Sequence, residues 1–242
     1  MKILFLGTLL SLQVAQAAPD VEKILQDSDA ARGGLGKGVS WSVQVKSFEG
    51  GESSDRSFVV RAKEKDALVE SETPAKFKGE IYLLNDKNMW FYKPTLKKPV
   101  SISARQKLSG QAANGDIAST NYYQDYAPTM EKQEACGKDT CYVILLQAKT
   151  TASTYDKIRY WVSTTSHLGM KAEFLTIQGK PFKKALFEYK NAIKVNGKDE
   201  KFISRMLIQD VKNPEEKSIL SYGKPKIEEH SISIFNVNNL SR

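Results

Sequence analysis

The first half of the chain alternates apolar and polar residues over short stretches. Val39, Trp41, Val43 and Val45, for example, are each followed by a polar residue. A period of two is typical of β-strands that bury one face. Further strands are predicted at residues 58–62, 67–72, 80–84, 89–93 and 100–103, with Gly, Pro, Asn and Asp between them. The pattern therefore predicts a series of antiparallel hairpins.

The second half of the chain repeats this pattern. It predicts strands at residues 142–148, 155–163, 170–178, 185–195, 202–210 and 218–222. The sequence Asn196-Gly197 favours a tight two-residue hairpin turn. An antiparallel sheet of about eleven strands has to curl, because a flat open sheet of that size is unusual.

Helical signals are confined to two regions. Near the N-terminus, Pro19 at a first helical position, the apolar Val21, Ile24 and Leu25, and a glycine pair at 33–34 predict one amphipathic helix. Residues 105–130 are mostly polar and predict short helices or loops. We expect a mainly β (α+β) fold, an unclosed antiparallel β-barrel of about eleven strands with these helices covering its concave face.

The N-terminus has the features of a secretory signal peptide. Lys2 precedes an apolar stretch over residues 3–14, and Ala15-Gln16-Ala17 forms a small-x-small cleavage site. We expect residues 1–17 to be removed after Ala17 and residues 18–242 to form a single domain, since no linker divides them. The predicted location is the periplasm, after export across the inner membrane.

Charge narrows the range of partners. The chain has 36 Lys and Arg against 28 Asp and Glu, and without the leader, whose one charged residue is Lys2, the net charge is +7. A basic exported protein is expected to associate transiently with anionic membrane surfaces, and nucleic acid is not an expected partner.

The two cysteines, Cys136 and Cys141, flank a short turn sequence, Gly-Lys-Asp-Thr. In an oxidising compartment this spacing suits a disulfide across a hairpin. A redox-active pair and a zinc site are the weaker alternatives. The spacing is not Cys-x-x-Cys, and neither His167 nor His230 lies close enough in sequence to complete a recognisable ligand set.

Motifs for catalysis or cofactor binding are missing from the sequence. It contains no His-Glu-x-x-His or Gly-x-Ser-x-Gly, and the glycine-rich stretch at 33–38 has Gly38 where a P-loop needs Ser or Thr. Asp27 and Asp29 are not followed by the glycine and glutamate of an EF-hand. We therefore expect no enzyme activity, no cofactor and no metal. An envelope hydrolase is the weakest functional hypothesis.

Several motifs carry a family resemblance that covers nearly the whole chain after the leader. They are Asp29-Ala30-Ala31-Arg32-Gly33, Trp90-Phe91-Tyr92-Lys93-Pro94, Asn114-Gly115-Asp116-Ile117-Ala118, the segment 155–162, Lys171-Ala172-Glu173-Phe174, Gly179-Lys180, and the ending 234–242. In this order they resemble the outer membrane lipoprotein-sorting protein family, which is related to the carrier LolA and the acceptor LolB. The resemblance implies an unclosed barrel lidded by helices, an apolar interior for acyl chains and no catalytic residues. It also implies an association with inner-membrane exporters of the RND/MMPL class.

Side chains along a strand alternate between its two faces, and this alternation predicts which residues form a lipid-binding face. The inward candidates are Trp41, Val43, Tyr82, Leu84, Met89, Phe91, Tyr160, Phe174, Phe187, Tyr189, Met206 and Ile208. Trp90, Trp161 and Leu207 have the opposite parity. Each inward candidate has a competing interpretation as ordinary core, because a barrel under a helix needs a core whatever its function.

Besides the envelope hydrolase, two functions stay open on this evidence. The first is a periplasmic carrier of the acyl chains of lipoproteins or free lipids, moving them toward the outer membrane. The second is a non-enzymatic accessory subunit of an RND/MMPL-type exporter, with a filled core.

Overall fold

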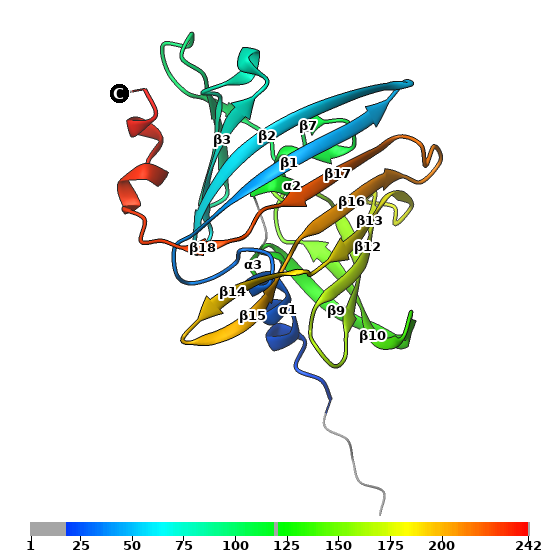
Figure 1. Cartoon of the computed structure of the whole chain (residues 1–242). Coiled ribbons are helices and arrows are strands. Elements are labelled where there is room, and N and C mark those ends of the chain that lie inside the picture. The colour runs from blue at the N-terminus through cyan, green and yellow to red at the C-terminus, as the bar shows by residue number, and fades with distance from the viewer. Residues whose placement is uncertain (1–17, 119–120, 242) are drawn as a thin grey trace, which may run out of the picture.

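The computed structural model describes residues 18–118 and 121–241, and its main element is one large antiparallel sheet (Figure 1). The predicted leader and its cleavage site lie outside the described residues. Within the described ranges the sheet has fourteen strands. In spatial order these are β6 (Val100–Ile102), β5 (Asn88–Tyr92), β4 (Ile81–Asn85), β3 (Asp66–Thr73), β2 (Glu52–Lys63), β1 (Val39–Glu49), β17 (Lys217–Tyr222), β16 (Arg205–Asp210), β13 (Pro181–Glu188), β12 (Gly169–Leu175), β11 (Lys157–Ser163), β10 (Asp139–Ala148) and β9 (Tyr126–Cys136), with β18 (Lys226–Ile227) also pairing with β1.

The end strands β6 and β9 do not pair with each other, so the sheet curls without closing. This confirms the expected mainly β, unclosed antiparallel barrel. Two small hairpins stand apart from the sheet, β7 (Lys107–Ser109) with β8 (Ala112–Ala113) and β14 (Asn191–Val195) with β15 (Lys198–Phe202). The helical elements are α1 (Val21–Ala30), α2 (Asn114–Ala118) and α3 (Tyr122–Asp125), and the 3₁₀ turns η1 (Ala75–Phe77), η2 (Ile232–Phe235) and η3 (Val237–Asn239).

The helices α1, α2 and α3 cover the concave side of the sheet, and we call them the lid (Figure 1). Asp20 caps α1 by accepting a hydrogen bond from the Lys23 N–H, so the helix begins at Val21, two residues later than the predicted start at Pro19. Ile24 and Leu25 are its buried apolar residues. No helix within the described residues is long and apolar enough to cross a membrane.

Strand β1 shows how the alternating pattern produces the sheet. Val39, Trp41, Val43 and Val45 are buried, while the polar residues from Ser42 to Lys46 on the other face are exposed. β1 pairs with β2 through a hairpin and with β17 from the far end of the chain. The concave face of the sheet is therefore the apolar one, as the parity predicts.

The sheet has more strands than the predicted eleven because β9 and the short β18 were not among the predicted strands. β9 begins within residues 105–130, for which only helices or loops were predicted, and continues into the disulfide hairpin. It is an edge strand with mostly exposed or half-buried side chains, so it has no apolar alternation. The predicted strand 185–195 is split into β13 and β14. The chain leaves the sheet at this point, and the Asn191 side chain donates hydrogen bonds to the carbonyls of Ile203 and Tyr222.

Two apolar clusters on the convex side are covered by other parts of the chain. The C-terminal turns η2 and η3 bring Phe235 and Leu240 onto Leu68 and Leu83 (Figure 1). At the other end of the sheet, Trp161 and Val143 pack beside Cys141 and Cys136. These cysteines form the predicted disulfide across the β9–β10 hairpin, with a Cα–Cα distance of 5.8 Å.

Candidate functional site

The twelve predicted inward residues all belong to one apolar cluster beneath the lid. Ten of them are buried, and Phe91 and Tyr189 are half-buried and pack against the others. Trp90 and Trp161 instead belong to the two convex clusters, and Leu207 is half-buried on the convex face. The sequence thus identified the correct face of the sheet. That these residues contact lipid stays a prediction.

Aromatic rings make up much of this face. Tyr82 lies between Phe58 and Phe91, with ring centroids 6.4 and 5.2 Å away. Tyr160 and Phe187 form a second aromatic pair at 6.0 Å. Broad, rigid rings of this kind offer a large contact area for an apolar ligand.

A buried ion pair lies where the lid meets the aromatic face. Asp29 in α1 and Arg32 just after it are 3% and 4% exposed, and their side chains are 3.2 Å apart. The Arg32 guanidinium lies over the Tyr122 ring, 4.0 Å from its centroid. Asp29 also accepts a hydrogen bond from the Tyr123 N–H of α3. Asp29 therefore joins α1 to α3.

In the sequence, Asp29 and Arg32 belong to a family motif, and Asp29 was considered only as a calcium ligand, so their pairing in the lid was not predicted. Their i,i+3 spacing at the end of an amphipathic helix was the available signal. It did not distinguish a solvent-exposed pair from a buried one, because the burial depends on α3 and on strands far along the chain.

Burial dominates the electrostatics of this region. It raises the pKa of Asp29 to about 6, although Arg32 and the Tyr123 N–H both act to lower it. Burial also raises the pKa of Asp116 in α2, whose carboxylate accepts hydrogen bonds from the Ala113 N–H and the Tyr155 hydroxyl. The pKa of Tyr122 rises to about 12 for the same reason. The lid therefore rests on carboxyl groups that are costly to ionise.

The space under the lid is nearly full. The cavity lined by Arg32, Asp116, Tyr155 and Met206 has a volume of about 20 Å³, which is room for one water molecule. An acyl chain would not fit there in this conformation. The interior residues are packed as a core, and a ligand could reach them only if the lid moved.

A larger groove of about 430 Å³ follows the outer edge of the lid. It lies between α1, the β14–β15 hairpin and the turn joining β11 to β12. Its apolar lining residues are Ala30, Ala31, Leu35, Leu168, Ile193 and Val195, and its polar ones are Asp27, Ser166, Glu200 and Lys201. At its base the Ala31 carbonyl accepts a hydrogen bond from the Ile203 N–H. The groove was not predicted, because it joins segments more than a hundred residues apart.

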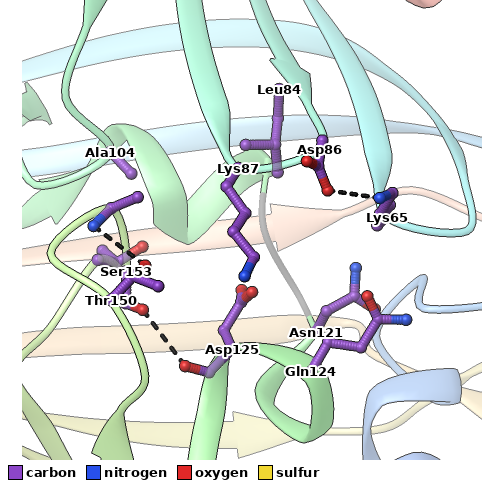
Figure 2. Close-up of a pocket in the computed structure, with 12 residues that line it drawn as sticks. Lys65, Leu84, Asp86, Lys87, Ala104, Asn121, Gln124, Asp125, Thr150 and Ser153 are labelled. Atoms are coloured by element: carbon purple, nitrogen blue, oxygen red, sulfur yellow. Dashed lines mark hydrogen bonds and ion pairs between the residues drawn. The ribbon is translucent and has the colours of Figure 1, made fainter.

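Figure 2 shows a second, polar pocket at the other edge of the lid, with a volume of about 30 Å³. Lys87 points from the β4–β5 turn toward Asp125 at the end of α3, and Lys65 forms an ion pair with Asp86 beside it (Figure 2). Because its lining is charged and its volume suits a single water, this pocket is not suited to an acyl chain.

Known proteins with similar sequences or structures were found for this chain. A protein-family model described as uncharacterized protein-like matches residues 63–242. No protein of curated function matches the chain. Among solved structures, a LolA superfamily protein from Nitrosomonas europaea is 26% identical, with a TM-score of 0.81, and the match covers 91% of this chain and 99% of the other.

Two more distant structures share the fold. A putative outer membrane lipoprotein-sorting protein domain from Vibrio parahaemolyticus is 19% identical, with a TM-score of 0.76, over 91% of this chain and 98% of its own. A DUF1329 family protein from Desulfovibrio piger is 17% identical, with a TM-score of 0.74, over 90% of this chain and 97% of its own. Each match spans the curled sheet and its lid.

Proposed function

We propose that this chain, which shares its fold with a LolA superfamily protein and with an outer membrane lipoprotein-sorting protein domain, is a periplasmic carrier without catalytic activity. Its cargo is the acyl chain of a lipoprotein or of a free lipid, held between the lid and the concave face and moved toward the outer membrane. An inner-membrane exporter of the RND/MMPL class is the predicted partner on the donor side.

The energetics of transport explain why such a carrier is needed. Each methylene group exposed to water costs about 0.8 kcal/mol, so a chain of about sixteen carbons costs roughly 12 kcal/mol in the aqueous periplasm. Binding must remove most of that area from water, and the filled interior cannot do so unless the lid separates. The helices of the lid are 10, 5 and 4 residues long, too short to be stable without tertiary contacts.

The groove along α1 is the observation that carries the proposal. Its volume of about 430 Å³ lies within the range of small-ligand sites, and its lining is largely aliphatic. Ile193 belongs both to the groove and to the main core cluster, so the groove continues into the apolar concave face. An acyl chain in the groove would wedge between α1 and the β14–β15 hairpin.

Filling the groove tests this proposal. Ala30→Trp places an indole where the acyl chain would lie, and we expect it to weaken binding of a fluorescent fatty acid about tenfold or more while the protein stays folded. Gln26→Trp adds the same side chain one turn earlier on α1, at an exposed position that does not line the groove, and should bind like the parent. Fluorescence titrations and thermal melts of the three proteins give the comparison. Equal binding by the parent and Ala30→Trp would contradict the groove as the binding site.

The packed interior also suits the alternative function, an accessory subunit of an exporter with a filled core. Lipids that co-purify with the protein separate the two functions. We expect acylated molecules in stoichiometric amounts, identified by mass spectrometry of organic extracts. A parent protein that carries no lipid and binds no fatty acid would favour the accessory subunit.

A further inference from the structure

The convex face of the sheet has a third apolar patch, which the described residues 18–118 and 121–241 leave uncovered. The C-terminal turns cover the patch around Leu83, and the disulfide hairpin covers the one around Trp161. Between them, Leu186 of β13 is 49% exposed, although it lies on a strand near the middle of the sheet. Its neighbours Ala185 and Phe187 belong to the concave core, so Leu186 lies on the opposite face of the strand and does not contribute to that core.

Register extends this patch across three strands. Leu186 pairs with Leu207 of β16, and Leu207 pairs with Ile219 of β17. The three side chains therefore form one row across the hydrogen-bonded strands, and the latter two are half-buried. We call Leu186, Leu207 and Ile219 the convex apolar row.

Lysines flank the convex apolar row. Lys184 and Lys217 belong to the adjacent row on the same face, both opposite Gln209, and neither forms an ion pair within the described residues. Lys46 extends the apolar row beyond Ile219 and lies opposite Asp55, again without an ion pair in the described part of the chain.

Two of the acidic residues beside the row are already neutralised, whereas Asp55, opposite Lys46, has no ion pair in the described part of the chain. Glu188 is paired with Lys190 and Arg205. Glu173 is paired with Arg159. Lys46, Lys184 and Lys217 outnumber this one carboxylate, so the surface around the convex apolar row combines aliphatic side chains with a net positive charge.

We propose that this surface docks the protein onto an anionic lipid bilayer, with the convex apolar row in the interface and Lys184 and Lys217 on the lipid phosphates. Aliphatic side chains bordered by lysines are the composition that such an interface favours. A second copy of this chain is disfavoured as the partner, because it would bring like charges together. The inference rests on the convex face alone and does not depend on cargo binding in the groove.

Vesicle co-sedimentation tests this surface on the mature protein. We expect binding to vesicles containing phosphatidylglycerol, release by salt, and at least tenfold weaker binding to pure phosphatidylcholine. Lys184→Glu combined with Lys217→Glu should weaken binding to the anionic vesicles about tenfold or more. The matched control is Lys97→Glu with Lys98→Glu, which makes the same change in net charge on an exposed loop and should retain most of the binding.

The apolar part of the surface has its own test. Leu186→Asn should also weaken vesicle binding, whereas Ile177→Asn, which alters a 62% exposed side chain in a hairpin turn, should not. If the Lys97/Lys98 control weakened vesicle binding as much as the Lys184/Lys217 variant, binding would depend only on the net charge of the protein, and the proposal would be overturned. Absence of vesicle binding by the parent would overturn it too, as would a dimer in sedimentation analysis that Leu186→Asn dissociates. Fatty-acid binding by each variant keeps this result separate from the carrier function.

Discussion

At the scale of single residues, Asp29 is the most informative group in the lid. It is buried, paired with Arg32, and bonded to the backbone of α3. Removing a buried group of this kind leaves its partner uncompensated, which is usually strongly destabilising. The lid is therefore held to the concave face partly by polar contacts, and its packing responds to protonation.

The raised pKa of Asp29, about 6 instead of 3.8, predicts a pH dependence of stability. The folded state binds this proton more tightly than the unfolded state, so the contribution of Asp29 is fully present below about pH 4 and is lost as pH rises through 6. The loss amounts to about 3 kcal/mol.

Asp29→Asn should abolish this part of the pH dependence. Urea denaturation of parent and variant between pH 4 and pH 7 measures it, and the difference between the two slopes isolates the single group. At pH 4 the parent's Asp29 is already protonated in the folded state, so the variant, with a neutral side chain of the same shape, is expected to have a similar stability there and to change less between these pH values. Parallel curves would show that Asp29 does not titrate in this range.

At the scale of elements, the C-terminal segment contributes to stability although it lies outside the sheet. Phe235 in η2 is 2% exposed and packs onto the strands β3 and β4. It closes an apolar patch that would otherwise face solvent beside Trp90. An element this short cannot be stable alone, so its contacts with the sheet hold it in place.

Phe235→Ala is expected to lower the free energy of unfolding by about 3 kcal/mol through lost burial and a residual cavity. Ile232→Ala in the same turn is the control, since Ile232 is 73% exposed and its truncation should cost less than about 0.5 kcal/mol. Urea denaturation gives both values. If the two variants were equally stable, the segment would not be docked on the sheet in solution.

At the scale of the whole molecule, the unclosed sheet leaves two edges that side chains bridge. Arg105, after β6, donates hydrogen bonds to Asp156 and to the Ser153 carbonyl near the far edge. Lys149 donates to the Tyr123 and Gln124 carbonyls at the end of α3. Polar contacts of this kind exchange readily with water, so the gap is the part of the barrel best able to widen.

Export is the remaining whole-molecule prediction. We expect the mature protein to begin at Ala18, because Ala15-Gln16-Ala17 provides the small-x-small cleavage site. Intact-mass measurement of protein recovered from the cell envelope decides it. A mass that includes residues 1–17 would remove the basis for a periplasmic carrier.

Much of the fold followed from local patterns, and the errors have local causes too. The alternation in β1 predicted its buried face correctly, because a strand that packs one face on a core has apolar residues at every second position. The cysteine spacing predicted the hairpin at 136–141, but the length of β9 was missed because an edge strand pairs on one side and keeps polar side chains. Asn191 ended β13 early through bonds to carbonyls that no local pattern reveals.

The sequence by itself determined which residues form the apolar face, the Cys136–Cys141 pairing and the mainly β fold, since these depend on side-chain period, short spacing and turn residues. Tertiary structure alone decided that β1 pairs with β17, that Asp29 and Arg32 are buried, and that the convex apolar row is left uncovered. A period of two reports that one face of a strand is apolar, but it does not report what covers that face. That depends on contacts between residues far apart in the chain, whose loop-closure cost and packing no local pattern records.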